Sequence, residues 1–336
     1  MSFTTTILDW FRENGRDLPW RQTTDPYAIW LSEIILQQTR IEQGRPYWER
    51  FMQRWPTVEA LAAATEDEVL REWQGLGYYS RARHLHQAAR QIVDMGHFPD
   101  TLEEIRLLKG VGDYTAAAIG SFAFGLPAAV VDGNVYRVLA RHFGIATPIN
   151  TTEGKKEFAA LAQELLPTAG DSLTSRPSSL ASDYNQAMMD FGAMQCTPQS
   201  PSCLLCPLAE SCVALRTGRV GELPVKLKTL KVKERHLIYI YVRCHGMTAI
   251  HRRGEGDIWQ GLWEPWLVEG DVPQGCRLLC KHVRHVLTHR ILLADFYLLE
   301  CDERPELPPD YVWISEEKLD DYAVPRLVEL LLLHTV

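Results

Sequence analysis

The chain lacks an apolar run of the ~18–20 residues that a membrane-spanning helix requires. Its first 20 residues, MSFTTTILDWFRENGRDLPW, also lack the charged and then apolar segments of a secretory signal peptide. No internal repeat is detectable. These absences favour a cytoplasmic protein. Its 336 residues suffice for two or three domains at roughly 100–200 residues each.

An excess of positive charge is also missing. Asp and Glu number 43 against 35 Lys and Arg, a net charge of −8. This balance argues against binding nucleic acid through bulk attraction, although a local basic patch can still contact its backbone. Residues 215–235 hold seven Lys or Arg against two Glu. We expect this stretch to be a solvated, basic interdomain linker.

Helical patterns extend from about residue 26 to 212, and β patterns follow the basic stretch. Thr65 with Glu68 and Thr101 with Glu104 fit the capping box that begins a helix. Prolines are expected to divide this region into short helices, namely Pro46, Pro56, Pro99, Pro127 and Pro148. HLIYIYVR, ILLADFYLLE and YVWI are typical of strands, and YAVPRLVELLLLHT of a closing helix. The patterns predict a helical N-terminal part and a smaller α+β C-terminal domain.

Four of the eight cysteines lie within 17 residues, namely Cys196, Cys203, Cys206 and Cys212. Clustered thiols in a chain without a secretory signal favour metal binding over disulfides. Four thiolates at this spacing suit either a tetrahedral zinc ion or a four-iron cluster. Zinc sites usually combine two C-x2-C pairs, and only one occurs here. The alternative is four unrelated buried cysteines.

Three further features suggest chemistry, each with a simpler interpretation. The glycine-rich turn in LLKGVGDYTAAAIGSFAF, residues 107–124, offers backbone N–H groups to a phosphate, or is a tight turn between helices. Glu33 lies in an apolar helical stretch, where burial would raise its pKa and make it a candidate general acid, or it faces solvent. Asp132, in AAVVDGNVYRVLAR, is placed to cap a helix.

Taken together, these motifs resemble the adenine DNA glycosylases of the MutY type. That family lies in the helix-hairpin-helix superfamily, which also contains endonuclease III. The resemblance covers nearly the whole chain. It rests on the four-cysteine spacing and on LSEIILQQT, GLGYYSRARHLH, GVGDYTAAAI, VVDGNVYRVLAR and NQAMMDFGAMQC.

The resemblance implies a mainly α helix-hairpin-helix glycosylase fold followed by an α+β Nudix-like domain. The six-helix domain would span residues 23–129. Residues 1–22 and 130–214 would form the cluster domain, and residues 236–336 the C-terminal lesion-recognition domain. The resemblance also implies a [4Fe-4S] cluster on the four cysteines. The hairpin residues that would hold DNA phosphate are Lys109, Gly110, Val111 and Gly112.

The implied partner is double-stranded DNA with adenine opposite 8-oxoguanine or guanine, bound by a monomeric, bacterial, DNA-associated protein without membrane contact. Adenine would be flipped out of the duplex for base excision repair. Substrate contacts are implied for Trp20, Arg21, Gln37, Gln38, Thr39, Leu76, Tyr78 and Gln186. Glu33 would protonate adenine N7, and Asp132 would stabilise the oxocarbenium-like sugar. Tyr114 and Asn134 would orient this step.

Several features sharpen or depart from the family pattern. Tyr114 stands where bifunctional endonuclease III-type enzymes carry the lysine nucleophile, so the resemblance implies a monofunctional glycosylase. The C-terminal match DIWQGLWEPW is followed by no pyrophosphatase run of glutamates. In the recognition loop, normally Phe-Ser-His, this chain has Leu287, Thr288 and His289, although a plain strand edge is the alternative. Lys109 replaces the usual hairpin proline.

Two other functions compete with this interpretation. An endonuclease III-like glycosylase/lyase acting on oxidised pyrimidines is opposed by Tyr114 and by the C-terminal domain. In a non-catalytic iron–sulfur DNA-binding protein, Glu33 and Asp132 would be structural. The complete set of pocket residues argues against this second alternative.

Overall fold

The computed structural model describes residues 2–167, 180–227 and 232–335. Contacts divide the chain into a first unit, Met1–Arg40 with Ala88–Lys228, and a second unit, Ile41–Gln87 with Thr229–Val336. Within the described ranges, no helix is both long and apolar enough to cross a membrane. Residues 168–179 of the predicted cluster domain and 228–231 of the predicted linker lie outside the described residues.

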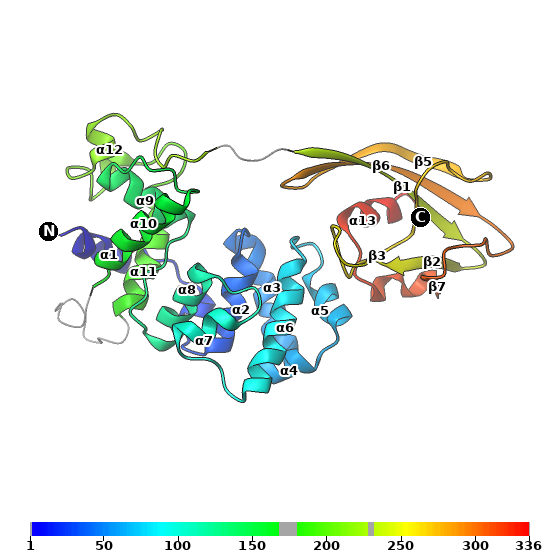
Figure 1. The fold of residues 1–336 in the computed structure, drawn as a ribbon, viewed down its shortest axis with the longest axis horizontal. Coiled ribbons are helices and arrows are strands. Elements are labelled where there is room, and N and C mark those ends of the chain that lie inside the picture. The colour runs from blue at the N-terminus through cyan, green and yellow to red at the C-terminus, as the bar shows by residue number, and fades with distance from the viewer. Residues whose placement is uncertain (1, 168–179, 228–231, 336) are drawn as a thin grey trace. The chain divides into compact units, whose positions relative to one another are not determined.

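The first unit is helical, as the sequence predicts (Figure 1). Its α-helices are α1 (Phe3–Asn14), α2 (Pro26–Leu36), α7 (Leu102–Leu107), α8 (Asp113–Phe124), α9 (Gly133–Phe143), α10 (Thr152–Glu164), α11 (Leu180–Asp190) and α12 (Val213–Arg216). Shorter helical turns among the described residues of this unit are η1 (Pro19–Arg21), η3 (Phe191–Gln195), which is a π-helix, and η4 (Cys203–Leu205). Helix α6 (Ser80–Met95) crosses the boundary between the two units.

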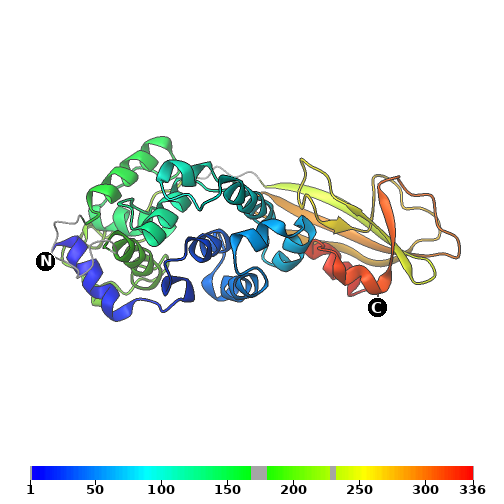
Figure 2. The ribbon, with the colours of Figure 1, turned by 90° about the horizontal axis from the view of Figure 1, so that it is seen from below.

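A single apolar cluster joins the N-terminal helix to the later helices of the first unit. Figure 2 shows α1, in dark blue, beside the green helix α11. Ile7 and Leu8 of α1 pack with Leu139 of α9, Phe158 of α10 and Ala187 of α11, all buried. Burial of these side chains excludes water from the interface and holds the N-terminal segment against α9–α11.

The described residues of the second unit form helices and two sheets. The helices are α3 (Ile41–Arg54), α4 (Val58–Ala63) and α5 (Glu66–Trp73), and near the C-terminus η5 (Glu316–Asp321) and α13 (Arg326–Leu332) follow. The strands are β1 (Lys233–Arg243), β2 (Met247–Arg252), β3 (Trp263–Glu264), β4 (Trp266–Val268), β5 (Arg277–Val286), β6 (Arg290–Glu300) and β7 (Tyr311–Ser315). Their orders are β4-β1-β6-β5 and β3-β2-β7, and the pair β1–β6 is parallel.

Helix α13 covers one face of the four-stranded sheet (Figure 1). Leu327 and Leu331 of this helix pack on Tyr239 of β1 and Phe296 of β6, and each is fully buried. Because strand side chains alternate between faces, residues 236, 238 and 240 of β1 point to the opposite face. One face of the sheet therefore packs into the apolar core with α13, and the opposite face carries the alternate set of side chains.

The predicted strands and closing helix are confirmed as β1, β6, β7 and α13, whereas β2, β3, β4 and β5 were missed. β5 lies at the edge of its sheet, and most of its residues are half-buried or exposed. Its sequence RLLCKHVRHV therefore carries charge where a buried strand would be apolar. The charged residues, histidines and single cysteine of such an edge strand give only a weak period-2 signal.

The helix-start prediction holds in full at Thr65 and for one of the two hydrogen bonds at Thr101, and one proline departs from expectation. Thr65 and Glu68 form the complete capping box of α5, and the Thr101 hydroxyl accepts the Glu104 amide at the start of α7. Pro46 does not end a helix as expected but lies inside α3. There it removes one hydrogen bond near the helix start, while Phe51 further along α3 is fully buried and anchors the helix.

Much of the predicted basic linker packs against the first unit. Leu223 is buried in the main apolar cluster, and the Val225 carbonyl accepts the Ile149 amide at 3.0 Å. The Asn150 side chain bonds both the amide and the carbonyl of Leu227, each at 2.9 Å. The expectation of a solvated linker therefore fails up to residue 227, because apolar residues between the cations supply buried contacts.

The two units also divide the chain at other points than the predicted domain boundaries. Residues 41–87, predicted within the six-helix domain, group with the C-terminal part of the chain. Within this second unit, the Gln74 side-chain amide donates to Glu329 at 2.8 Å, and Arg252 contacts Glu66 at 2.9 Å. The boundaries at 23–129 and 130–214 stay a prediction.

Candidate active site and cysteine site

Glu33 lies on α2, a helix that is buried along most of its length. Its side chain is 6% exposed, which excludes the alternative that it faces solvent. The Tyr114 hydroxyl, from the first turn of α8, donates to Glu33 Oε2 at 3.0 Å. Burial raises the pKa of Glu33 to about 7, against the opposing effects of this hydrogen bond and of the Arg21 charge. Glu33 can therefore hold a proton near neutral pH.

Asp132 is the N-cap of α9, as the sequence predicts. Its Oδ1 accepts the backbone amides of Asn134 at 2.8 Å and Val135 at 2.7 Å, and its Oδ2 accepts Asn134 Nδ2 at 2.7 Å. Burial raises the pKa of Asp132, while these three donors and the charge of Arg137 oppose the rise. The Asp132 charge in turn raises the pKa of Glu33, so the two carboxyl groups interact.

Arg137, one turn along α9, links Asn134 to the start of the cysteine segment. Its Nη2 donates to Asn134 Oδ1 at 2.8 Å and to the Gly192 carbonyl at 2.6 Å, and its Nε donates to the Cys196 carbonyl at 2.7 Å. Sequence reasoning missed this residue. The available signal was an arginine on the apolar side of VVDGNVYRVLAR, where a buried cation needs several acceptors.

The structure brings the four clustered cysteines together. Cys196, Cys203, Cys206 and Cys212 all line one cavity in the first unit. Arg141 of α9 joins them, because its Nη1 lies 3.5 Å from Cys196 Sγ and donates to the Thr197 carbonyl at 2.7 Å. A guanidinium beside four thiolates offsets part of their negative charge. The alternative of four unrelated cysteines is therefore excluded.

The donor set of this cavity suits a metal centre. Its four sulfur donors lie among apolar residues such as Ala209, Leu215 and Val220. Four cysteines that meet in one cavity fit either a tetrahedral zinc ion or a four-iron cluster.

The residues predicted to contact the flipped base have defined partners. Trp20 is 7% exposed on η1. Arg21 donates to both oxygens of Asp190 at 2.8 Å, and Arg16 contacts the same carboxylate. Gln186 Nε2 donates to the Ser182 hydroxyl at 2.9 Å. Arg21 is therefore held in an ion pair with a buried aspartate that sequence reasoning missed, and it acts on Glu33 through its charge.

The residues after α2 form a tight, polar turn. Gln37 Nε2 donates to the Thr115 hydroxyl of α8 at 3.1 Å, and the Thr39 hydroxyl donates to the Gln37 carbonyl at 3.3 Å. Gln38 has a φ of 55°, a left-handed conformation that is uncommon for a residue other than glycine. Such backbone conformations persist where the surrounding contacts hold them, so this turn is a well-defined feature of the first unit.

The turn between α7 and α8 exposes the predicted phosphate-binding residues. Lys109 and Gly110 are exposed, and Gly110 has a φ of 79° that favours glycine. The Lys109 amide donates to Gln91 Oε1 at 2.8 Å, and the Val111 amide donates to the Leu108 carbonyl. Gly112 caps α8 without a side-chain hydrogen bond. The start of α8 therefore offers backbone donors to an anion.

The second unit contains a cleft of about 550 Å³ that gathers the remaining predicted residues. Two chain segments supply these predicted residues. Leu76 and Tyr78 belong to the earlier segment, and residues 287–289 belong to the later one. Tyr78 is 47% exposed, and its hydroxyl lies 2.7 Å from the Thr288 hydroxyl. Trp259 and Arg83 also line this cleft and were missed. Trp259 belongs to the motif DIWQGLWEPW, which begins at Asp257. This motif could have indicated that Trp259 lines the cleft.

Comparison with known protein families identifies both parts of the chain. Residues 31–168 match the model of the HhH-GPD superfamily base excision DNA repair protein, and residues 238–334 match that of the NUDIX domain. A thermostable thymine-DNA glycosylase has a similar structure, with a TM-score of 0.57, 32% identity, and coverage of 64% of this chain and 95% of its own. A non-covalent endonuclease III–DNA complex shares the fold, with a TM-score of 0.53, 23% identity, and coverage of 65% and 99%.

Curated relatives narrow the family. The adenine DNA glycosylase of Buchnera aphidicola from Schizaphis graminum is 31% identical over 264 residues, which cover 78% of this chain and 73% of that protein. The human adenine DNA glycosylase is 43% identical over 224 residues, or 63% of this chain and 39% of the human protein. The match thus spans about two fifths of the length of the human protein. The chain belongs to the adenine DNA glycosylase family.

Proposed function

We propose that this protein is a monofunctional adenine DNA glycosylase of base excision repair, which removes adenine paired with 8-oxoguanine or guanine. The observation that carries the proposal is the pair of interacting carboxyl groups in the first unit. Glu33 is buried with a pKa of about 7, and Asp132 accepts three N–H donors at a helix N-terminus. One group is suited to give a proton and the other to face a cation.

The reaction begins when adenine leaves the duplex, at a cost of about a few kcal/mol. Protonated Glu33 transfers its proton to adenine N7, so the electron pair of the breaking N-glycosidic bond leaves on a neutral base. The sugar C1′ becomes cationic, and the Asp132 carboxylate stabilises it. Water then adds to C1′ and gives a proton to the Glu33 carboxylate. Tyr114 holds the orientation of Glu33 through its hydrogen bond.

Tyr114 supports a glycosylase without lyase activity. The Tyr114 side chain is a phenol that is hydrogen-bonded to the buried Glu33 carboxyl group. A phenol cannot form the Schiff base through which an amine would open the sugar. Its pKa is raised well above the usual value by burial and by the nearby carboxyl groups, which keeps the hydroxyl protonated as a donor. The product would therefore be an abasic site in an intact strand.

The cysteine cavity supports a resident [4Fe-4S] cluster held by Cys196, Cys203, Cys206 and Cys212. When bound, the cluster would link the four cysteines rigidly to one another and so stiffen the C-terminal part of the first unit. Arg141 touches the cavity, and Arg137 connects the Cys196 carbonyl to Asn134 beside Asp132. The protein's own contribution is this chain of hydrogen bonds, which positions the Asp132 cap.

The remaining parts of the proposal concern DNA. The α7–α8 turn would bind a phosphate through backbone amides. The cleft of the second unit would read the base opposite adenine, with Tyr78, Thr288 and His289 at its lining. Residues 23–129, 1–22 with 130–214, and 236–336 are proposed as the functional domains of a cytoplasmic monomer.

A single-turnover assay on a short duplex containing adenine opposite 8-oxoguanine tests this function. We expect the wild-type chain to release adenine, and Glu33→Gln and Asp132→Asn each to lose at least ~100-fold in rate. Glu157→Gln on α10 and Asp94→Asn on α6 are matched controls, since both residues are exposed in the first unit. They should keep the wild-type rate.

Two outcomes would overturn the proposal. One is equal rates for the wild type and both variants of the carboxyl pair. The other is efficient borohydride trapping of the wild type on DNA, which would indicate a Schiff-base nucleophile. In the same assay, Thr288→Val should reduce the preference for 8-oxoguanine over guanine while adenine release opposite guanine continues.

A further inference from the structure

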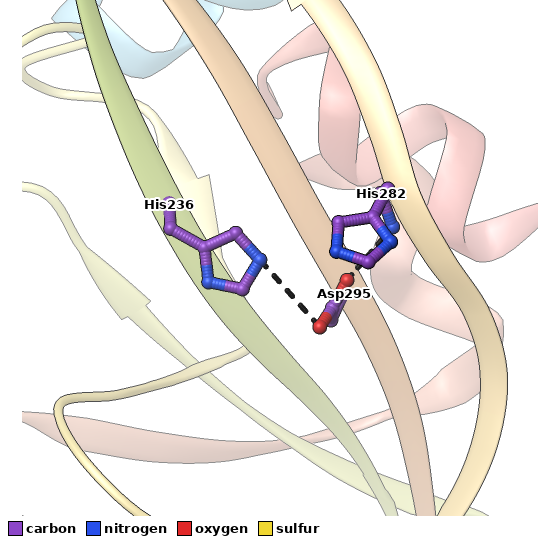
Figure 3. Close-up of side chains that lie close together, drawn as sticks. All are labelled: His236, His282 and Asp295. Carbon is purple, nitrogen blue, oxygen red and sulfur yellow. Dashed lines mark hydrogen bonds and ion pairs between the residues drawn. The ribbon is translucent and has the colours of Figure 1, made fainter.

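Three potential metal ligands lie close together on the four-stranded sheet of the second unit. None of them takes part in the proposed removal of adenine. Figure 3 shows His236 of β1, His282 of β5 and Asp295 of β6, with the imidazole of His236 directed toward the carboxylate. One ligand atom from each residue lies within 4.8 Å of those of the other two. Three adjacent strands thus present two imidazoles and one carboxylate together.

The distances suit ligands of one ion better than a simple ion pair. His236 Nε2 lies 3.5 Å from Asp295 Oδ2, longer than an N–H···O hydrogen bond of about 2.7–3.2 Å. Two ligands at about 2.0–2.2 Å from a tetrahedral zinc ion are separated by about 3.4 Å. The two imidazole centroids lie 6.0 Å apart and the rings are tilted by 43°.

The backbone holds His282 toward this point. The register of β5 on β6 shifts between Cys280 and Val283, so two residues of β5 oppose Asp295. His282 has a φ of 55°, a left-handed conformation seldom adopted by a residue other than glycine. Its amide donates to Asp295 Oδ1 at 2.7 Å. This hydrogen bond fixes the carboxylate and leaves Oδ2 directed toward His236, as partners of metal ligands commonly do.

Exposure of the three side chains allows an ion to enter and water to complete its shell. The Asp295 side chain is 9% exposed, while that of His236 is 45% exposed. His282 is also exposed. The carboxylate thus lies at the bottom of the site and the imidazoles at its rim. Imidazole and carboxylate ligands together suit zinc among the common ions.

We propose that His236, His282 and Asp295 bind one Zn²⁺ ion, with water in the fourth position. The ion would connect the edge strand β5 to β1 across β6. Binding would stabilise the second unit without changing the residues proposed for adenine removal.

The test is isothermal titration of the purified full chain, with its cysteine site loaded, using Zn²⁺ alone. We expect one site in the wild type and at least about tenfold weaker binding for His236→Ala, His282→Asn and Asp295→Asn. His282→Asn is chosen because asparagine tolerates the left-handed conformation. Asp295→Asn keeps an oxygen for the His282 amide. His334→Ala, an exposed histidine of the same unit, is the matched control.

Thermal unfolding and crystallography separate a true site from loss of structure. Zn²⁺ should raise the Tm of the wild type and of His334→Ala, but not that of the three variants. Crystals soaked with Zn²⁺ should show anomalous density between the three side chains. Titrations that are identical for the wild type and the three variants, or anomalous density only elsewhere, would overturn the proposal. Adenine release by the wild type does not depend on the result.

Discussion

Carboxyl groups behave differently in the two units. In the first unit, Glu33 is 6% exposed and has an uncharged hydrogen-bond partner, Tyr114, and burial raises its pKa to about 7. In the second unit, the Asp257 side chain is 32% exposed, and hydrogen bonds and charges from arginines prevail over its partial burial and lower its pKa to about 2. Burial and the number of adjacent cations together decide whether a carboxyl group is an acid or a permanent anion.

The arginine network around Asp257 illustrates the second case. Arg235, Arg253 and Arg290 all donate to its carboxylate, and Arg253 also pairs with Glu264, which is 1% exposed. A charge network of this kind serves the structure, because each carboxylate in it has guanidinium partners within hydrogen-bond distance. The Glu33 site suits proton transfer, because Glu33 has a neutral hydroxyl as its hydrogen-bond partner and a raised pKa.

Removing the central arginine should have the largest effect. Arg253→Met would leave the buried Glu264 without its cation, and we expect a loss of about 3–5 kcal/mol in the free energy of unfolding. Urea denaturation of the full chain measures it. Arg252→Met is the neighbouring control, since Arg252 is 40% exposed and its ion pairs with Glu66 and Asp67 should contribute at most ~1 kcal/mol. Equal losses for both variants would refute the structural role of the network.

The Glu33 site should instead show a stability that depends on pH. The folded state keeps the Glu33 proton up to about pH 7, whereas the unfolded chain releases it near the ordinary value of 4.5. Wild-type stability should therefore fall relative to Glu33→Gln as pH rises from 4.5 through 7, by roughly 3 kcal/mol in all. Urea denaturation of both chains between pH 4.5 and 8 measures this difference, and a constant difference across the range would contradict the raised pKa.

A smaller effect should follow from loss of the Tyr114 hydroxyl. Its hydrogen bond lowers the pKa of Glu33, so Tyr114→Phe should raise that pKa and shift the high-pH limb of the rate profile upward. We expect a rate change of less than about tenfold at pH 7, measured by single-turnover adenine release across pH. Tyr136→Phe on α9 is the control. A profile with an unchanged high-pH limb would mean that Tyr114 does not act through Glu33.

Local features of this molecule could be predicted where neighbouring residues decide the outcome. The Asp132 cap and the Thr65 capping box depend on residues two or three positions away, and both occur as predicted. The strands β1 and β6 are long and apolar enough to be recognised. The motifs around Glu33 and the cysteine spacing likewise indicated the family before any fold was known.

Contacts between residues far apart in the chain determine the features that the sequence pattern could not predict. Periodicity could not show that Glu33 is buried, because its burial depends on packing between α2 and α8. Nor could it show that Arg21 pairs with Asp190, which lies 169 positions further along the chain. The grouping of residues 41–87 with the C-terminal sheets and the meeting of His236, His282 and Asp295 arise in the same way. The amino-acid order alone was enough to indicate the family, the caps and the residues available for chemistry. Which of these residues are buried or paired follows from the folded arrangement, because burial and charge pairing depend on residues that are distant in sequence.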